Sequence, residues 1–378
     1  MKYDYLIVGA GLYGCTIARL LTDAGYKCLI VEKHNYIGGG CHDYPLNNKD
    51  AKYEATVHEF GPHIIHTSDE DVINFLSKYV KLNHFIANTI ALDDDNKLYH
   101  LPFNANTFYD IFGVSSIKEI NDIIEKERVK IDNPKNLEEK ALSLIGPTIY
   151  NKMIKEYTKK QWNKDPKELP ADIIIRIPIR MYYNNNYFFD EYQGIPIGGY
   201  TKMFYNIIDG IDCRLGYDIN EHKDDISKYK NVIYCGAVDE LLNYKLGVLE
   251  YRSLKFEHKT YTFDYKDSQG NAVTNLIGKQ RGTRIIDHIW FTPELVESYI
   301  GKTVVKTLEV PDDWDIHKER YYPINDDKNN SLYDEYVKLL KVEYPNITLG
   351  GRIGKYKYFD MDDTIKEAMK DFKKLTNK

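Results

Sequence analysis

The sequence predicts an α/β fold: a discontinuous Rossmann-type dinucleotide-binding domain with an inserted helical subdomain and an antiparallel β-sheet substrate domain. Three observations predict it. A strand, a glycine-rich turn and a helix follow one another within residues 6–24, residues 103–157 show helical periodicity, and polar and apolar residues alternate within 250–310. At 378 residues the chain is long enough for two or three domains.

The glycine-rich turn follows a short buried strand. Leu6-Ile7-Val8 leads into Gly9, Gly11 and Gly14, which have the spacing of a dinucleotide-binding turn. Glycines let the backbone approach a pyrophosphate that a Cβ would block, and the start of the next helix offers free N–H groups and a partial positive charge. The order of strand, turn and helix therefore predicts a dinucleotide site rather than a turn that binds nothing.

The next helix and strand complete this unit. The apolar positions of the helix are Ile17, Leu20, Leu21 and Ala24. Gly25 is placed to end the helix in the left-handed conformation. Residues 27–31 are predicted to form a buried parallel strand that ends at Glu32, whose carboxylate is expected to bind a ribose hydroxyl. An acid here argues against a 2′-phosphate, so NADP is the least expected ligand.

A second glycine turn, Ile37-Gly38-Gly39-Gly40, comes soon after this acid. Many flavoproteins extend the nucleotide site with such a turn, and this resemblance favours FAD over NAD. Spacing alone does not separate the two cofactors.

Composition excludes several other classes of function. The formal net charge is −6, which does not suggest a nucleic-acid-binding surface. The five cysteines are scattered, with no CxxC pair and no histidine at metal-ligand spacing, so reduced thiols and no metal site are expected. No apolar run approaches the ~20 residues that span a bilayer. We therefore expect a cytoplasmic protein with no membrane span.

Histidines flank a rigid turn between the nucleotide-binding unit and the next helix. Gly61-Pro62 marks the turn, so His63 and His66 are expected on irregular backbone before a helix that Ser68 caps. A binding site explains this arrangement at least as well as ordinary surface histidines do.

The middle of the chain changes character twice. Residues 85–92 and 97–101 are predicted to form a β-hairpin, and residues 103–157 a group of helices. Arg176-Ile177-Pro178-Ile179-Arg180 follows, with aromatic residues after it. A guanidinium can hold a phosphate through two parallel hydrogen bonds. From the residues alone, however, a solvated linker is the favoured explanation.

The remaining segments return to the first domain. Residues 231–235 are predicted to form a short parallel strand, and 347–349 another before the C-terminal helix, which either faces a flavin ring with its N-terminus or caps the sheet. The expected division is residues 1–83, 206–245 and 345–378 for the FAD-binding domain, 102–168 for the helical subdomain, and 84–101, 169–205 and 246–344 for the sheet domain, with a mobile loop near 168–180.

Together the motifs resemble the bacterial-type UDP-galactopyranose mutases over nearly the full chain. The motifs that carry the resemblance are the glycine turn, Gly61-Pro62-His63, Tyr157 to Trp162, Arg176 to Arg180, Asn186-Tyr187-Phe188, Gln193-Gly194, Gly198 to Thr201, Tyr251-Arg252, Thr283-Arg284-Ile285, Tyr321-Tyr322-Pro323 and Gly351-Arg352 through Asp362. Each motif is weak alone, whereas their order and spacing are specific.

The resemblance implies an isomerase that interconverts UDP-galactopyranose and UDP-galactofuranose without net redox change. It implies noncovalent FAD that is active when reduced, whose N5 forms an adduct with the sugar and expels UDP. It further implies a UDP-galactose-type sugar nucleotide, an external reductant such as NAD(P)H, a homodimer, and a role in synthesis of surface glycans.

The same resemblance assigns residues to roles. Arg176 and Arg284 match the arginines that bind the diphosphate, and His63 matches the histidine beside the flavin ring. The expected substrate-binding residues are Tyr157, Trp162, Tyr187, Phe188, Arg252, Tyr322 and Tyr358. The expected cofactor-binding residues are Gly9, Gly11, Gly14, Glu32, Lys33, Gly39, Gly61, His63, Arg352, Tyr358, Asp360 and Met361.

The sequence departs from the family pattern at four places, and the resemblance places the last two of them, residues 308–310 and 279–282, near the sugar end of the substrate site. Asn163 replaces a usual Gly, Gly40-Cys41 replaces Asn-Ser or Asn-Cys, Leu308-Glu309-Val310 replaces Lys-Glu-Tyr, and residues 279–282 differ from Asp-Val-Pro-Tyr. UDP-N-acetylgalactosamine and dTDP-fucose therefore stay open as substrates. Two further functions compete with a mutase: an FAD oxidoreductase of the amine-oxidase type and a non-catalytic binder of sugar nucleotides.

Overall fold

The computed structural model describes residues 2–171 and 179–376 and contains the predicted parallel sheet. Five short strands, all paired in parallel within the described residues, run in the order β16 (Ile347–Leu349), β10 (Asn231–Tyr234), β1 (Tyr5–Val8), β2 (Cys28–Val31) and β9 (Asp212–Arg214). The three central strands are almost fully buried, as their continuous apolar runs predict. The returning strands 231–235 and 347–349 are thus confirmed.

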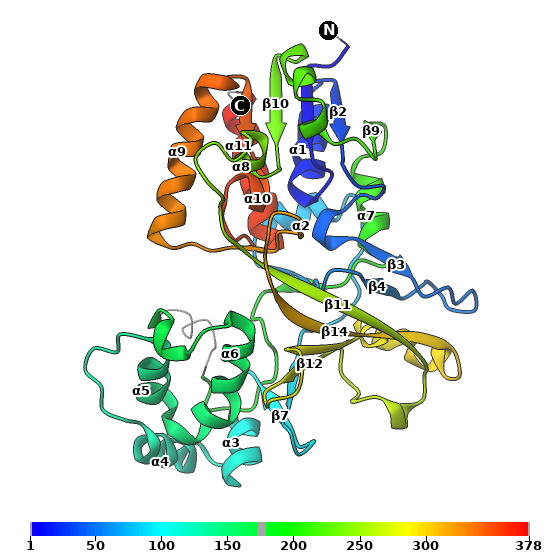
Figure 1. Cartoon of the computed structure of the whole chain (residues 1–378). Coiled ribbons are helices and arrows are strands. Elements are labelled where there is room, and N and C mark those ends of the chain that lie inside the picture. The colour runs from blue at the N-terminus through cyan, green and yellow to red at the C-terminus, as the bar shows by residue number, and fades with distance from the viewer. Residues whose placement is uncertain (1, 172–178, 377–378) are drawn as a thin grey trace.

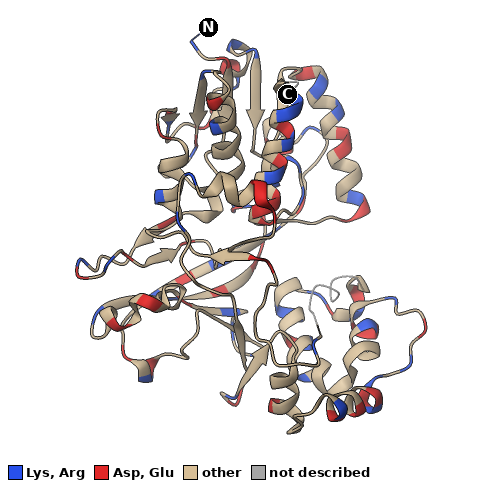
Figure 2. Cartoon of the chain, turned by 180° about the vertical axis from the view of Figure 1, so that it is seen from behind, with Lys and Arg blue, Asp and Glu red and all other residues tan. Residues whose placement is uncertain are grey.

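Helices from the two ends and the middle of the chain cover this sheet (Figure 1). They are α1 (Leu12–Asp23), α2 (Glu70–Leu76), α7 (Tyr200–Ile207), α8 (Val238–Leu241), α9 (Asp327–Glu343), α10 (Gly351–Gly354) and α11 (Met361–Thr376). Helix α1 packs on α11, so the C-terminal helix lies against the helix that follows the glycine turn. Figure 2 shows acidic and basic residues mixed along α9 and α11. No described helix is long and apolar enough to cross a membrane.

The cap of α2 differs from the prediction by one residue. Asp69, not Ser68, is the N-cap: its Oδ1 accepts hydrogen bonds from the backbone N–H of Asp71 at 2.9 Å and of Val72 at 3.2 Å. Ser68 instead donates its hydroxyl to Asp190 at 3.4 Å. Both side chains suit an N-cap, and the tertiary contact with Asp190 engages the serine.

A second, larger sheet crosses the middle of the molecule (Figure 1). Its seven described strands run in the order β15 (Tyr322–Pro323), β11 (Tyr251–Thr262), β14 (Thr303–Asp313), β13 (Arg284–Asp287), β12 (Val273–Leu276), β6 (Thr89–Leu92) and β7 (Leu98–Leu101). The hairpin β6–β7 is confirmed. The sheet is mixed rather than purely antiparallel, because β6 pairs with β12 in parallel.

Smaller elements complete the fold. Two two-stranded sheets pair β3 (Asp43–Pro45) with β4 (Thr56–His58) and β5 (Ile65–Thr67) with β8 (Tyr192–Gly194). The helical part contains α3 (Ala105–Phe112), α4 (Ile117–Glu127), α5 (Leu137–Ile149) and α6 (Lys155–Trp162), around a core that includes Phe108, Ile120 and Ile145 and is shared with the hairpin β6–β7. Helix α6 reaches the larger sheet and contacts β14.

Candidate active site

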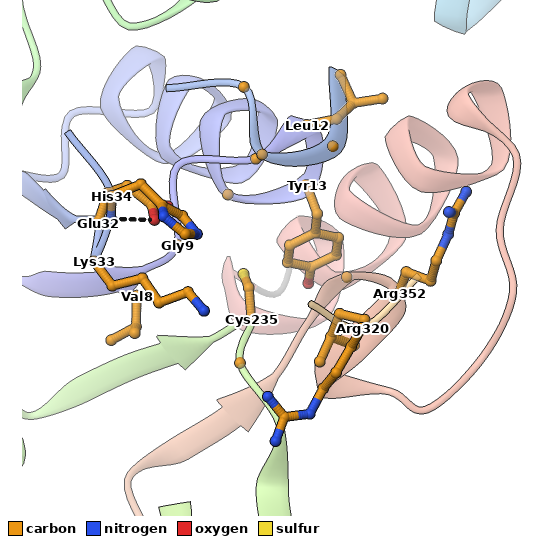
Figure 3. Close-up of a pocket in the computed structure, with 18 of the residues that line it drawn as sticks. Val8, Gly9, Leu12, Tyr13, Glu32, Lys33, His34, Cys235, Arg320 and Arg352 are labelled. Carbon is orange, nitrogen blue, oxygen red and sulfur yellow. Dashed lines mark hydrogen bonds between the residues drawn. The ribbon is translucent and has the colours of Figure 1, made fainter. Parts of the chain in front are cut away.

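A cavity of about 330 Å³ lies at the carboxyl ends of β1, β2 and β10, where parallel sheets bind their ligands. Figure 3 shows Glu32, Lys33 and His34 on one side of it and Arg320 and Arg352 on the other, with Tyr13 and Cys235 between them. The predicted cofactor residues that line it are Gly9, Gly11, Gly14, Glu32, Lys33, Gly39, His63, Arg352 and Met361. Gly61, Tyr358 and Asp360 are not among the lining residues.

The three glycines of the first turn differ in what a side chain would meet. A Cβ on Gly14 would lie 2.0 Å from the carbonyl oxygen of Gly9, so this glycine permits the close approach of helix and strand. Gly9 has φ +107, a left-handed conformation that favours glycine. At Gly11 a Cβ would meet nothing within 4 Å. The missing side chain of Gly11 therefore leaves open space at the start of α1.

The second glycine turn lies directly against the first. Gly38 donates its N–H to the Ala10 carbonyl at 2.8 Å, and a Cβ on Gly39 would lie 3.3 Å from the Cα of Gly11. Gly11 is also the N-cap of α1, and no side chain caps this helix start. The paired turns and the uncapped helix start together form a cradle for a diphosphate.

Glu32 lies where the ribose-binding acid is expected. Its carboxylate is 7% exposed and accepts hydrogen bonds from the backbone N–H of Ala10 at 2.8 Å and of His34 at 3.0 Å. The neighbouring Lys33 places its Nζ 3.4 Å from Glu319 Oε1. These contacts hold an acceptor at the end of β2, beside the glycine turns.

His63 lies on the predicted turn and its imidazole is neutral. Burial lowers the pKa of His63 to about 3, and the neighbouring His58 and the cations Arg352 and Arg284 also disfavour a charged imidazole here. Its Nδ1 lies 3.0 Å from the carbonyl oxygen of Gly61. A carbonyl only accepts, so Nδ1 carries the proton and Nε2 is an acceptor.

Arg284 forms the centre of the predicted substrate region. It donates from Nε to Glu309 Oε1 at 2.9 Å, and its Nη2 lies 2.8 Å from Oε2. Although burial opposes it, the charge of Glu309 raises the pKa of Arg284 further, so the guanidinium is always charged. Its charge also interacts with the phenols of Tyr157, Tyr187 and Tyr322. Sequence segments far apart thus converge on one cation.

Arg352 borders this region on the cofactor side. Its Nη2 donates to the Phe359 carbonyl at 2.6 Å, and its guanidinium carbon lies 4.7 Å from the ring centre of Tyr358 and 5.8 Å from that of Tyr322. The Tyr358 hydroxyl donates to Asp360 at 2.8 Å. Met361 and Thr364, in the first turn of α11, line the cavity, so this helix start faces the nucleotide site.

Four of the predicted substrate-binding residues are held by contacts with neighbouring elements. Trp162 and Tyr157 come from α6 and pack partly against the helical core. Arg252 donates from Nη2 to the Gln161 carbonyl at 3.0 Å and so ties the end of α6 to β11. Phe188 stacks on the His66 ring, with centroids 3.6 Å apart.

The predicted arginine loop falls largely outside the structure. Arg176 lies outside the described residues. Arg180 is described and is buried, 4% exposed, where it donates to the carbonyls of Asn184 and Asn186 and covers the Phe189 ring. Arg180 therefore shapes its own loop.

The sequence did not reveal two charged pairs of the site. Glu309, the partner of Arg284, was noted only as part of a departure from the family pattern. Arg320 and Glu240 line the cavity and form an ion pair at 3.0 Å, with Arg320 also facing Trp314. The position of Arg320 two residues before the Tyr322 motif is the signal that could have pointed to it.

Comparisons with known proteins agree with this geometry. The family model for UDP-galactopyranose mutase matches residues 152–358, and that for an NAD(P)-binding Rossmann-like domain matches residues 7–79. The chain is 37% identical to a dTDP-fucopyranose mutase of Escherichia coli, covering 96% of both chains, and 37% identical to a probable UDP-galactopyranose mutase of Klebsiella pneumoniae, covering 97% of this chain and 93% of that one.

The fold agrees as well. A crystal structure of reduced UDP-galactopyranose mutase superposes with a TM-score of 0.71 at 15% identity, covering 100% of this chain and 94% of the other. Family model, relatives and fold point the same way, and the chain belongs to the UDP-galactopyranose mutase family of enzymes.

Proposed function

We propose that this chain interconverts UDP-galactopyranose and UDP-galactofuranose, without net redox change, with reduced FAD bound noncovalently. The observation that carries the proposal is the position of Arg284. A permanently charged guanidinium, oriented by Glu309, interacts through its charge with Tyr157, Tyr187 and Tyr322 and with the neutral His63 of the dinucleotide cavity. This arrangement suits a substrate that carries a diphosphate next to a cofactor ring.

The cavity fits FAD. The open space at Gly11, the adjoining Gly39 turn and the uncapped start of α1 suit the diphosphate, and the Glu32 carboxylate suits a ribose. His63, Arg352 and Met361 would hold the flavin end. When bound and reduced, FAD supplies the nucleophile that displaces the nucleoside diphosphate from the sugar.

The residues of the chain bind and orient the leaving group. Glu309 engages Nε and Nη2 of Arg284 and thereby fixes the plane of the guanidinium. The diphosphate gains negative charge as it leaves, and a fixed cation stabilises that charge more in the transition state than in the bound substrate. Tyr187 and Tyr322 would donate hydrogen bonds from their hydroxyls to it, and Tyr358 would do so once its hydroxyl exchanges Asp360 for the diphosphate. Tyr157 and Trp162 would face the base. We assign Arg176 the same role as Arg284.

Other parts of the proposal follow the family. We infer a homodimer, an external reductant such as NAD(P)H, and the domain bounds given above with one correction. Helices α7 and α9 belong with the FAD-binding domain, because their buried residues share the cores that enclose β1 and β10. The five cysteines are all free, which supports a reducing compartment such as the cytoplasm.

A second candidate substrate is dTDP-fucose. The relative that supports it is named a dTDP-fucopyranose mutase, and it is as similar to this chain, at 37% identity, as the probable UDP-galactopyranose mutase. Neither Arg284 nor the glycine turns distinguish between these sugars, because both substrates carry the same diphosphate.

One experiment tests the proposal. The purified yellow protein is reduced with dithionite, offered UDP-galactofuranose, dTDP-fucofuranose or the furanose form of UDP-N-acetylgalactosamine in parallel, and the products are separated by chromatography. We expect conversion of UDP-galactofuranose to the pyranose only after reduction. Faster conversion of dTDP-fucofuranose than of UDP-galactofuranose would identify dTDP-fucose as the substrate. Flavin reduction by an amine, with no isomerisation, would overturn both.

A further inference from the structure

The backbone of His63 is held at both of its polar atoms by two buried side chains. The His63 N–H donates to Nδ1 of His58 at 3.2 Å, and the His63 carbonyl accepts from the Tyr200 hydroxyl at 2.8 Å. His58 is 1% exposed and Tyr200 is 0% exposed. A buried hydrogen bond restricts both partners, so these two bonds fix the peptide units on either side of His63.

The two holding side chains also contact each other. The rings of His58 and Tyr200 meet edge to face, with centroids 5.3 Å apart and planes at 82°. His58 stacks on Phe291, at 4.4 Å and 11°, and its backbone N–H donates to Nδ1 of His288 at 3.2 Å. The His58 ring therefore has little freedom to turn away from His63.

One residue pair of a small sheet positions both side chains. In the β3–β4 pair, Asp43 lies directly opposite His58. The Asp43 carboxylate accepts from the first N–H groups of α7, those of Tyr200 and Thr201, each at 2.8 Å. Gly199 allows this approach, because a Cβ there would lie 2.5 Å from Asp43 Oδ2. The Asp43–His58 pair thus positions His58 directly and Tyr200 through the start of α7.

The protonation state of His58 agrees with its part in this geometry. Nδ1 of His58 accepts a hydrogen bond from a backbone N–H, so it carries no proton. Burial lowers the pKa of His58 to about 3, so the acceptor persists throughout the physiological range. The imidazole of His63 is oriented in turn by its own contact to Gly61.

We propose that His58 and Tyr200 are positioning residues that hold the His63 imidazole in place for the ring of the bound flavin. The inference rests on the proposed function only in taking His63 to face the flavin. His58 and Tyr200 act through the backbone of His63, and neither is among the residues that line the dinucleotide cavity.

Three variants test the proposal. Tyr200→Phe removes one hydroxyl, His58→Phe removes the acceptor but keeps a flat ring against Phe291, and His58→Asn keeps an acceptor near the place of Nδ1. The matched control is Tyr336→Phe, because Tyr336 is also 0% exposed and donates to a backbone carbonyl, that of Gly247. Gly247 contacts Tyr336 of α9 and does not line the dinucleotide cavity.

The readouts are the visible spectrum and reduction midpoint of bound FAD, the Kd for FAD, the histidine-selective NMR signal of His63 in the apoprotein, and kcat and KM. We expect Tyr200→Phe and His58→Phe to move the His63 signal, shift the flavin spectrum and midpoint, and lower kcat about tenfold with KM nearly unchanged. The double variant, with Tyr200→Phe and His58→Phe combined, should lower kcat by less than the product of the two single effects, since both changes act on His63. His58→Asn should leave the His63 signal, the flavin spectrum and midpoint, and kcat close to their wild-type values.

The proposal is overturned if Tyr200→Phe and Tyr336→Phe lower the melting temperature alike and leave the His63 signal and the flavin properties unchanged. It is also overturned if His58→Asn behaves no better than His58→Phe. A wild-type protein that binds FAD but isomerises no sugar would refute the proposed function instead, and the spectral and NMR readouts would still decide the role of His58 and Tyr200.

Discussion

Arg284 and Glu309 lie directly opposite each other on the neighbouring antiparallel strands β13 and β14, and their side chains meet at two points. Glu309 has a side chain only 3% exposed, whereas that of Arg284 is 23% exposed. The carboxylate is therefore buried behind the guanidinium, which faces the site. A cation held in this way needs little reorganisation when an anion binds it.

Replacement of Arg284 by Ala should lower kcat by about 10²–10³-fold, because the leaving diphosphate loses its fixed cation. Arg284→Lys should restore little, since an ammonium cannot form the two-point contact. Steady-state kinetics on the reduced enzyme measure both. The matched control is Arg128→Ala, which breaks an exposed pair with Glu125 on α4 and should leave kcat unchanged. Near-normal turnover of the Arg284 variant would refute the assigned role.

Gly11→Ala should abolish FAD binding without unfolding the protein. The new Cβ meets no protein atom within 4 Å but enters the space proposed for the diphosphate. Gly14→Ala should instead prevent folding, because its Cβ would lie 2.0 Å from the Gly9 carbonyl oxygen. The flavin-to-protein absorbance ratio and the melting temperature distinguish the outcomes. A Gly11 variant that keeps its full flavin content would contradict the placement of the diphosphate.

Lys160 should make stability rise with pH above about 8. Its Nζ donates to the carbonyls of Leu276 at 2.7 Å and Gln280 at 3.0 Å, and burial lowers its pKa to about 8. Between that pKa and the ordinary lysine value of 10.5, the unfolded chain binds a proton that the folded chain lacks, so raising the pH favours the fold.

Other groups titrate in the same range, so the measurement compares the wild type with Lys160→Met. We expect the wild type to gain melting temperature relative to this variant between pH 8 and 10. A constant difference across the range would show that Lys160 has an ordinary pKa.

Acid should destabilise the protein below pH 6.5 through its buried histidines. Burial lowers the pKa of His58 to about 3 and that of His288 well below its usual value, so the unfolded chain takes up protons that the fold excludes. Stability therefore falls as pH falls from 6.5 towards 3, by up to about 1.4 kcal/mol per pH unit for each such histidine. Urea unfolding at pH 7 and pH 5 measures this fall, and His58→Asn should make it shallower. An equal slope in both proteins would count against a neutral His58.

The nucleotide-binding unit could be predicted from sequence because each step of it has a local signal. Gly9, Gly11, Gly14 and Glu32 are fixed by spacing within one strand–helix–strand unit, and the structure brings all of them to one cavity. The helix end at Gly25 is also as predicted, with φ +93. Here local preference and tertiary structure agree.

Contacts made by strand register could not be predicted in this way. Glu309 meets Arg284 only because β13 and β14 pair with one particular offset, and nothing near either residue specifies it. The same holds for Asp43 opposite His58. The parallel pairing of β6 with β12 joins two segments that are far apart in the sequence and that no short motif connects. The residue pattern within each segment predicts a strand but does not show which other strand it pairs with.

That parallel pairing has a consequence for synthesis of the protein. Thr89 of β6 lies opposite Val273 of β12, so the edge of the hairpin has no partner until the ribosome has made the greater part of the chain. At the usual pace of translation this wait lasts on the order of ten seconds or more. Throughout it a hairpin that has formed leaves this edge unpaired, with a row of N–H and C=O groups open to pairing with another chain.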